Sequence, residues 1–266
     1  MRVGIDLMGS DAAPRLLFPA VVQAARQLGQ PVEFVVFALP SVINDLAEDL
    51  HRSSLPSNAS SITFQSADDV IGMDDDPLAA VRKKDRSTLV QGIHKLKNGA
   101  LDAFISCGNT GALVAAATLF LPHLKGVSRP GLLAVLPTEK GTVVILDVGG
   151  NVSCKAEHLI NYAHIGSVYA RIAQGISLPK VALLNIGTEA GKGTEEVRLA
   201  YKQLEAIEKS RAEGGRASFQ FCGNIEGRDL FKGGCDVVVT DGFSGNIMLK
   251  TAEGVSSYIL DALGKD

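Results

Sequence analysis

The chain has 266 residues, of which 46% are hydrophobic and 21% are charged, and its formal net charge is −3. This length fits one large α/β domain or two smaller lobes, and the composition is that of an ordinary globular protein. Because the sequence has no Trp and no basic block, nucleic acid is not expected as a partner. The four cysteines form no C-x-x-C pair and the five histidines no H-E-x-x-H pair, so no metal site is expected.

The N-terminus and the cysteines bear on the location of the protein. The residues MRVGIDLMGSD are expected to form a strand and its turn rather than a signal peptide. The longest apolar run, GALVAAATLFLP, is too short to cross a bilayer. Widely separated cysteines fit reduced thiols. We therefore expect a cytoplasmic protein that at most rests on a membrane surface.

Runs rich in β-branched residues predict nine strands, at 3–7, 32–39, 61–65, 102–106, 132–136, 143–148, 181–186, 217–222 and 236–240. Several are apolar throughout, which is typical of parallel strands buried on both faces. Apolar residues at helical spacing predict a helix over about 153–174. A second helix is expected to begin at Thr194, a suitable N-cap, with Glu195 and Glu196 in its first turn, and residues 253–266 should form a third. This alternation predicts a mostly parallel sheet with right-handed crossovers, in a single α/β domain spanning 1–266.

Six of the predicted strands end in turns rich in glycine and asparagine, at 5–14, 105–113, 145–153, 183–193, 221–227 and 237–246. Carboxyl ends of parallel strands share one edge, where ligands bind, and helix N-termini after such turns offer free N–H groups. Each turn alone could be an ordinary tight connection, but together they predict a site for phosphate or a phosphorylated molecule. The residues expected to bind it are Gly9, Ser10, Asp11, Asn109, Thr110, Gly111, Asp147, Asn151, Gly187, Asn224, Asp241, Gly242, Phe243 and Gly245.

Known nucleotide and nucleophile motifs do not match these turns. GTEAGKG, at 187–193, has the wrong spacing for a P-loop and a glycine where Ser or Thr is needed. No strand opens onto G-x-G-x-x-G, so no nicotinamide or other cofactor is expected. GFSGN lacks the spacing of G-x-S-x-G, which argues against Ser244 as a nucleophile. The chemistry is therefore expected to be direct attack by a bound small molecule.

Eight stretches in the expected order carry a specific resemblance: DLMGSDAAP, VIGMDDDPLAAVRKKDRSTL, DAFISCGNTGAL, ILDVGGNVSCKAEHL, GSVYAR, VALLNIGTEAGKG, GNIEGRDLF and DVVVTDGFSGNIMLKTAEG. They resemble the bacterial acyl-acyl-carrier-protein:phosphate acyltransferases of phospholipid synthesis, the PlsX family. The resemblance covers almost the whole chain. It implies a Rossmann-like three-layer α/β/α fold similar to phosphate acetyltransferases and isocitrate dehydrogenase-like proteins. It also implies formation of acyl phosphate from fatty acyl carrier protein and inorganic phosphate, a homodimer, and peripheral association with the inner face of the cell membrane.

The sequence departs from the family pattern at three places. Ala12 stands where the family's M-G-G-D-H-A-P has histidine, so a proton-carrying role of that histidine cannot apply. Ser153 replaces an aspartate of L-D-x-G-A-N-V-D, so no ligand role is expected of a carboxylate there. Family members usually continue past the position of Asp266, and the chain is expected to lack those C-terminal helices and last strand.

In the implied reaction a phosphate oxygen attacks a thioester carbonyl, so the enzyme must hold two anionic groups together and stabilise an oxyanion. Lys192, beside glycine-rich backbone, is the first catalytic candidate, and Asn246 is the second, as a donor to the oxyanion or phosphate. The alternatives are a solvated lysine at a helix start and a helix N-cap. Asp147 and Asp241 are expected to orient donors, since like charges repel. Two other functions stay open: a phosphate acyltransferase that uses acyl-coenzyme A, and a non-catalytic module that binds a phosphorylated metabolite.

Overall fold

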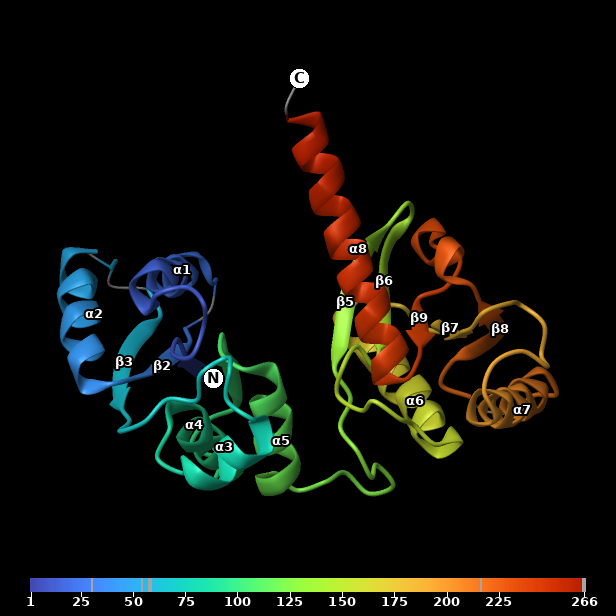
Figure 1. The fold of residues 1–266 in the computed structure, drawn as a ribbon, viewed down its shortest axis with the longest axis horizontal. Coiled ribbons are helices and arrows are strands. Elements are labelled where there is room, and N and C mark those ends of the chain that lie inside the picture. The colour runs from blue at the N-terminus through green and yellow to red at the C-terminus, as the bar shows by residue number, and fades with distance from the viewer. Residues whose placement is uncertain (30, 54, 57–58, 216, 265–266) are drawn as a thin grey trace. The chain divides into compact units, whose positions relative to one another are not determined.

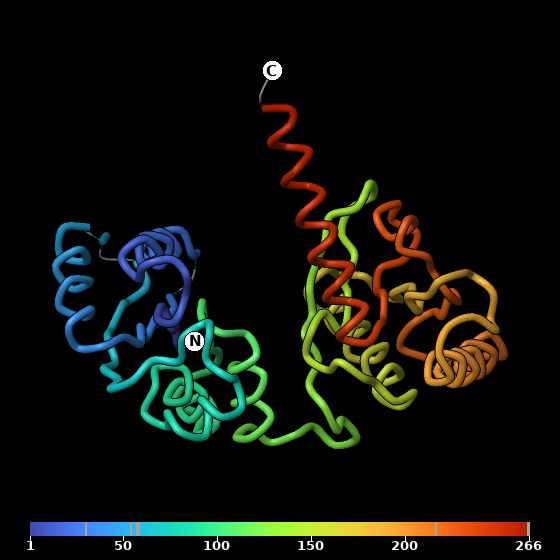
Figure 2. The backbone as a smooth tube through the Cα atoms, in the orientation of Figure 1, coloured from blue at the N-terminus to red at the C-terminus, as the bar shows by residue number. Residues whose placement is uncertain are grey.

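The structure is a computed structural model that describes residues 1–29, 31–53, 55–56, 59–215 and 217–264. The chain divides into two compact units, Met1–His123 (unit 1) and Leu124–Asp266 (unit 2). Each unit has its own sheet and its own helices, as the ribbon and the backbone tube show (Figure 1; Figure 2). Two compact lobes can still unfold as one cooperative domain, so the single domain expected over 1–266 stays a prediction.

Unit 1 is built on a four-stranded sheet of order β3-β2-β1-β4 in which all neighbouring strands are parallel. Its strands are β1 (Arg2–Asp6), β2 (Glu33–Ala38), β3 (Ser61–Ser66) and β4 (Ala103–Ser106). Its helices are α1 (Pro14–Gln27), α2 (Pro40–Arg52), α3 (Pro77–Lys83), α4 (Thr88–Lys97) and α5 (Thr110–Phe120).

Helices cover both faces of this sheet. Val3 and Ile5 of β1 pack with Phe18 of α1, while α2 contributes Leu46 to the same apolar cluster. Phe104 of β4 points to the other face and packs against the cluster formed by α3, α4 and α5. Unit 1 therefore has three layers, with the sheet in the middle (Figure 1).

Unit 2 contains a five-stranded sheet of order β5-β6-β9-β7-β8. Its strands are β5 (Leu133–Thr138), β6 (Gly141–Leu146), β7 (Lys180–Leu184), β8 (Gln220–Ile225) and β9 (Val237–Val239). Its helices are α6 (Ala156–Ala173), α7 (Glu195–Ala212), the short 3₁₀ helix η1 (Gly227–Lys232) and α8 (Gly242–Leu263). All neighbours are parallel except β5 and β6, which form an antiparallel hairpin.

Strict alternation along β6 separates two cores in unit 2. Val144 and Leu146 face the cluster made with α6 and α7. Val143 and Ile145 face the opposite cluster, which includes η1 and the first half of α8. Residues 143–146 of the strand are buried on both sides, which explains why this part of its sequence is apolar throughout.

The structure confirms the predicted α/β class and the mostly parallel sheet, and each of the nine predicted runs overlaps a strand. Thr194 caps α7 as expected, because its side chain accepts from the Val197 N–H. The helix predicted over 153–174 is α6, which begins three residues later, at Ala156. The antiparallel direction of β5 follows from its connection: two residues between Thr138 and Gly141 allow a hairpin but no crossover.

The C-terminal half of α8 differs from the rest of unit 2, because every residue from Glu253 to Gly264 is exposed. Val255, Ile259 and Leu263 continue the stripe that packs lower down the helix, and their side chains are 52%, 48% and 69% exposed. In Figures 1 and 2 this part of α8 extends past the sheet of its own unit. No helix within the described residues is long and apolar enough to span a membrane.

Candidate active site

Four of the six glycine- and asparagine-rich turns lie at one edge of the unit 2 sheet. Leu146 of β6 and Leu183 of β7 both pair with Val239 of β9, so the turns that follow these three strands are neighbours. The end of β8 is adjacent, since Leu184 pairs with Ile225. The other two turns follow β1 and β4, which are neighbours in unit 1. A single cradle formed by all six turns stays a prediction.

Asp147 organises the turn after β6. Its carboxylate is fully buried and accepts hydrogen bonds from the N–H groups of Leu132, Gly149, Gly150 and Asn151 at 2.8–3.1 Å. The Asn151 side chain adds a fifth bond at 3.0 Å. The carboxylate thus satisfies backbone donors of its own loop, which agrees with an orienting role rather than contact with an anion.

Asn151 links this turn to the interior. Its side-chain amide also donates to the Tyr162 hydroxyl at 2.8 Å and to the Pro130 carbonyl, and the backbone carbonyl of Asn151 accepts from Gly242 N at 2.8 Å. A Cβ on Gly242 would lie 2.7 Å from the Asn151 carbonyl oxygen. The N–H donors of the Asn151 side chain are therefore used in bonds within the protein. Its expected contact with phosphate stays a prediction, and no free side-chain donor supports it.

Asp241 caps α8, because its carboxylate accepts from Ser244 N at 2.8 Å and from the Ser244 hydroxyl at 3.0 Å. Asn246 is consequently not the N-cap, so that alternative is wrong. Its side chain is exposed, and its Oδ1 lies 3.8 Å from where a Cβ on Gly149 would stand. Phe243 is 57% exposed at the same helix start. Asn246 is thus available as a donor beside the turn after β6.

Lys192 lies in the loop between β7 and α7, not inside the helix. Its side chain is half exposed, and its Nζ is 3.9 Å from Glu189 Oε1, too far for a short hydrogen bond. Gly187 packs closely against it, since an added Cβ would be 3.3 Å from Lys192 Cγ. The ammonium is therefore accessible and only loosely paired.

Two asparagine side chains hold this loop. Asn224, at the end of β8, donates to the Glu189 carbonyl at 2.9 Å. Asn185 donates to the Lys192 carbonyl at 3.1 Å and accepts from Ile186 N at 2.8 Å. The sequence reasoning selected Asn224 but passed over Asn185. The available signal was its place in the glycine-rich stretch 183–193, one of the six strand ends from which the other asparagines were selected.

In unit 1 the ends of β1 and β4 are joined by a buried carboxylate. Asp6 accepts from the Ser106 hydroxyl at 2.9 Å and from Met8 N at 3.0 Å. Burial raises the pKa of the Asp6 carboxyl above its ordinary value, and this outweighs the lowering by its hydrogen bonds. Gly9 has φ +72° and an added Cβ would lie 2.2 Å from the Ile71 carbonyl oxygen, so only glycine fits.

The neighbouring residues of unit 1 divide into internal and exposed ones. Asn109 is buried: it caps α5 by accepting from Ala112 N at 3.0 Å and donates to the carbonyls of Gly72, Met73 and Asp75. The side-chain contact with phosphate expected of Asn109 therefore has no free donor in this structure. Three expected binding residues stay exposed, namely Asp11, Thr110 and Gly111, and Ser10 is half-buried.

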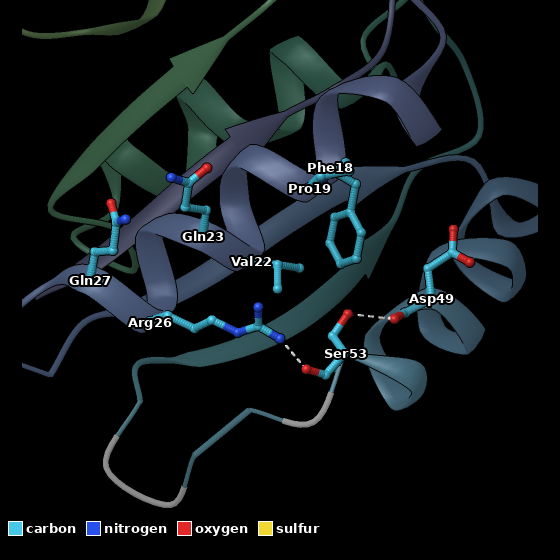
Figure 3. Close-up of a pocket in the computed structure, with 8 residues that line it drawn as sticks. All are labelled: Phe18, Pro19, Val22, Gln23, Arg26, Gln27, Asp49 and Ser53. Carbon is cyan, nitrogen blue, oxygen red and sulfur yellow. Dashed lines mark hydrogen bonds between the residues drawn. The ribbon is translucent and has the colours of Figure 1, made fainter.

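A pocket in unit 1 lies away from these turns. Figure 3 shows that it is lined by residues of α1, among them Phe18 and Val22, and by the end of α2, with Arg26 donating to the Ser53 carbonyl. These helix ends lead into β2 and β3, so the pocket is at the amino edge of the sheet. Ligands of parallel α/β sheets bind at the carboxyl edge, and we assign the pocket no part in the chemistry.

The thiols near the strand ends are poor nucleophiles. Burial, helped by nearby Asp147, raises the pKa of Cys154, and burial with nearby Asp6 raises that of Cys107. Both are therefore protonated at neutral pH. The arrangement offers an accessible ammonium at Lys192 and an exposed amide at Asn246, which suits binding of an anion and stabilisation of an oxyanion.

A family model described as fatty acid synthesis protein matches residues 1–266. The chain belongs to the fatty acid synthesis protein family. This confirms the resemblance stated from the sequence. Among relatives in this family, the phosphate acyltransferase of Halalkalibacterium halodurans is 39% identical over 270 residues, covering 100% of this chain and 74% of the relative. The phosphate acyltransferase of Chlamydia pneumoniae is 41% identical over 270 residues, covering 99% and 79%. The chain thus spans about three quarters of the length of such family members.

Two solved structures with low sequence identity share the fold of this chain. EutD phosphotransacetylase from Staphylococcus aureus aligns with a TM-score of 0.60 at 18% identity, covering 96% of this chain and 82% of that one. A branched-chain phosphotransacylase from Enterococcus faecalis gives 0.52 at 15% identity, covering 94% and 84%. At such identities the likeness shows the fold alone, and it agrees with the expected Rossmann-like architecture.

Proposed function

We propose that the protein is a phosphate acyltransferase that moves a fatty acyl group from acyl carrier protein to inorganic phosphate, for phospholipid synthesis. The observation that carries this proposal is the similarity over the whole chain, at 39–41% identity, to relatives named phosphate acyltransferase. The family description, which places the chain in fatty acid synthesis, supports the fatty acyl substrate.

The proposed chemistry takes place at the carboxyl edge of the unit 2 sheet. A phosphate oxygen attacks the thioester carbonyl carbon, the C–S bond breaks, and the departing thiolate takes up a proton. The Lys192 ammonium and the Asn246 amide are proposed to bind the phosphate and the developing oxyanion. Lys192 lies in the loop after β7 and Asn246 near the start of α8, after the neighbouring strand β9. Phosphate is largely ionised at neutral pH, so no strong general base is required of the protein.

The finer partners are proposals that rest on the resemblance. The proposed partner, acyl carrier protein, is an acidic protein. The exposed Arg82 and Lys83 at the end of α3 offer a basic surface that could bind it by charge complementarity. A homodimer and peripheral association with the inner face of the cell membrane are proposed on the same basis. The exposed apolar residues of α8 are compatible with either contact.

The test uses purified chain with fatty acyl carrier protein, and it measures thiol release and acyl phosphate with and without phosphate. Lys192→Ala should lower phosphate-dependent turnover by ~10²–10³, the usual cost of one oxyanion donor. Lys202→Ala, which removes an exposed lysine from α7 outside the loop, is the control and should stay active. A near-normal rate of Lys192→Ala at saturating phosphate would remove Lys192 from the mechanism.

The same assay separates the alternative functions. Faster turnover with acyl-coenzyme A than with acyl carrier protein would favour the coenzyme A-dependent enzyme. Absence of any phosphate-dependent thiol release from either thioester would favour a non-catalytic binding module.

A further inference from the structure

The loop that carries Lys192 is closed by side chains from two different strand ends. It runs from Asn185, directly after β7, to Gly193, directly before the cap of α7. The lysine side chain has four rotatable bonds, so its ammonium can be positioned only if the loop backbone is itself fixed. The bonds to its backbone carbonyls are therefore the features that bear on the position of the ammonium.

Asn185 holds the end of the loop at the lysine itself. Its Nδ2 donates to the Lys192 carbonyl at 3.1 Å and its Oδ1 accepts from Ile186 N at 2.8 Å. One partner can only accept and the other can only donate, so the orientation of the amide is fixed by its surroundings. Gly193, at φ +88°, packs onto the same amide: an added Cβ would lie 2.6 Å from Asn185 Oδ1.

Asn224 holds the middle of the loop from the neighbouring strand. The Glu189 carbonyl accepts from Asn224 Nδ2 at 2.9 Å and from Lys192 N at 3.1 Å, which closes the turn Glu189–Lys192. Asn224 is 9% exposed, and its Oδ1 has no hydrogen-bond partner among the described residues. Within the part of the chain that the structure describes, the Asn224 side chain is therefore attached to the loop through its Nδ2 donor alone.

We propose that Asn185 is a positioning residue for Lys192, with Asn224 as the second anchor of the same loop. Asn185 bonds the carbonyl of the lysine, and Asn224 bonds the carbonyl to which the N–H of the lysine is also bonded. Together they fix both ends of the Lys192 backbone while leaving its ammonium free to reach a ligand. This inference rests on the proposed role of Lys192 in acyl transfer.

The test is a double-mutant cycle with Asn185→Ala and Lys192→Ala, measured as turnover at saturating phosphate and saturating fatty acyl thioester of acyl carrier protein. Asn185→Ala alone should lower turnover ~10- to 100-fold, because a catalytic group misplaced by about 1 Å can cost that much. In the Lys192→Ala background the same change should alter turnover by less than about twofold, since no ammonium remains to be placed.

Asn161→Ala is the matched control. Asn161 lies on α6 in the same unit and donates to the Gly126 carbonyl at 2.9 Å, so its loss removes one comparable bond. It should lower the thermal unfolding temperature, because a side-chain hydrogen bond is lost, and leave turnover unchanged. If Asn185→Ala does not fold, Asn224→Ala takes its place in the cycle with the same expectation.

Two results would overturn the inference: full activity of Asn185→Ala, or an equal loss in both backgrounds, which would show an effect independent of the lysine. A normal rate of Lys192→Ala is a different outcome. It would end the proposed role of Lys192 before Asn185 is changed, and the positioning role would end with it.

Discussion

Gly245→Ala offers a direct test of how closely α8 must approach the turn after β6. Gly245 is in the first turn of α8, and an added Cβ would lie 1.9 Å from the Asp147 carbonyl oxygen and 2.8 Å from Thr240 Cγ2. Real Cβ atoms essentially never come within 3.0 Å of such atoms, so the helix start and the turn must move apart by at least 1.1 Å (3.0 − 1.9). Both neighbours are backbone or tightly packed, and neither can yield by rotating a flexible side chain.

This shift should carry Asn246 away from the turn, because it is the next residue of the same helix. We expect turnover to fall ~10²-fold, a loss that a misplacement of about 1 Å can cause. Overpacking of about 1–3 kcal/mol should lower the thermal unfolding temperature by roughly 2 to 12 °C. Gly254→Ala is the control: it is in the same helix, with no described atom within 4 Å of its added Cβ, and should gain about 1 kcal/mol of helix stability. Wild-type turnover and unfolding temperature in Gly245→Ala would refute the reasoning.

Two further predictions concern ionisable groups. The raised pKa of Asp6 means that its ionised form destabilises the folded state, so wild type should lose stability as pH rises above about 4. Asp6→Asn cannot ionise, so its unfolding temperature should increase relative to that of wild type over the same pH range. Unfolding scans between pH 4 and 7 measure this, and a difference independent of pH would contradict it. Cys107→Ala should keep its phosphate-dependent turnover, because its raised pKa keeps the thiol protonated. Detection by mass spectrometry of an acyl group bound to Cys107 would overturn this prediction.

The fold could be predicted from the sequence to a large extent because its signals are local. Apolar runs such as those of β6 and β9 are buried on both faces, and burial of this kind leaves an unbroken pattern. The cap of α7 is equally local, since Thr194 bonds an N–H three residues away. The direction of β5 was less accessible, because an apolar run does not say which way a strand points.

The roles of individual asparagines could not be predicted in the same way. Asn109 and Asn151 each follow a strand in a glycine-rich turn, as a ligand-binding residue would. In the structure their amides bond carbonyls at Gly72 and Pro130, 37 and 21 residues away. Asn246 has the same type of side chain but stays exposed. Distant contacts, not residue type, decide which amide is available to a substrate.

Helix α8 consists of two segments that differ greatly in stability. Its first turns are fastened to the sheet through Met248 and Leu249, whereas the backbone from Glu253 to Leu263 gains nothing from its own unit beyond helical hydrogen bonds. A peptide helix shorter than ~12–15 residues is marginal in water, so this end should open and close independently of global unfolding. Amide deuterium uptake should accordingly rise steeply along α8 once Lys250 is passed, unless another surface comes to lie against its apolar stripe.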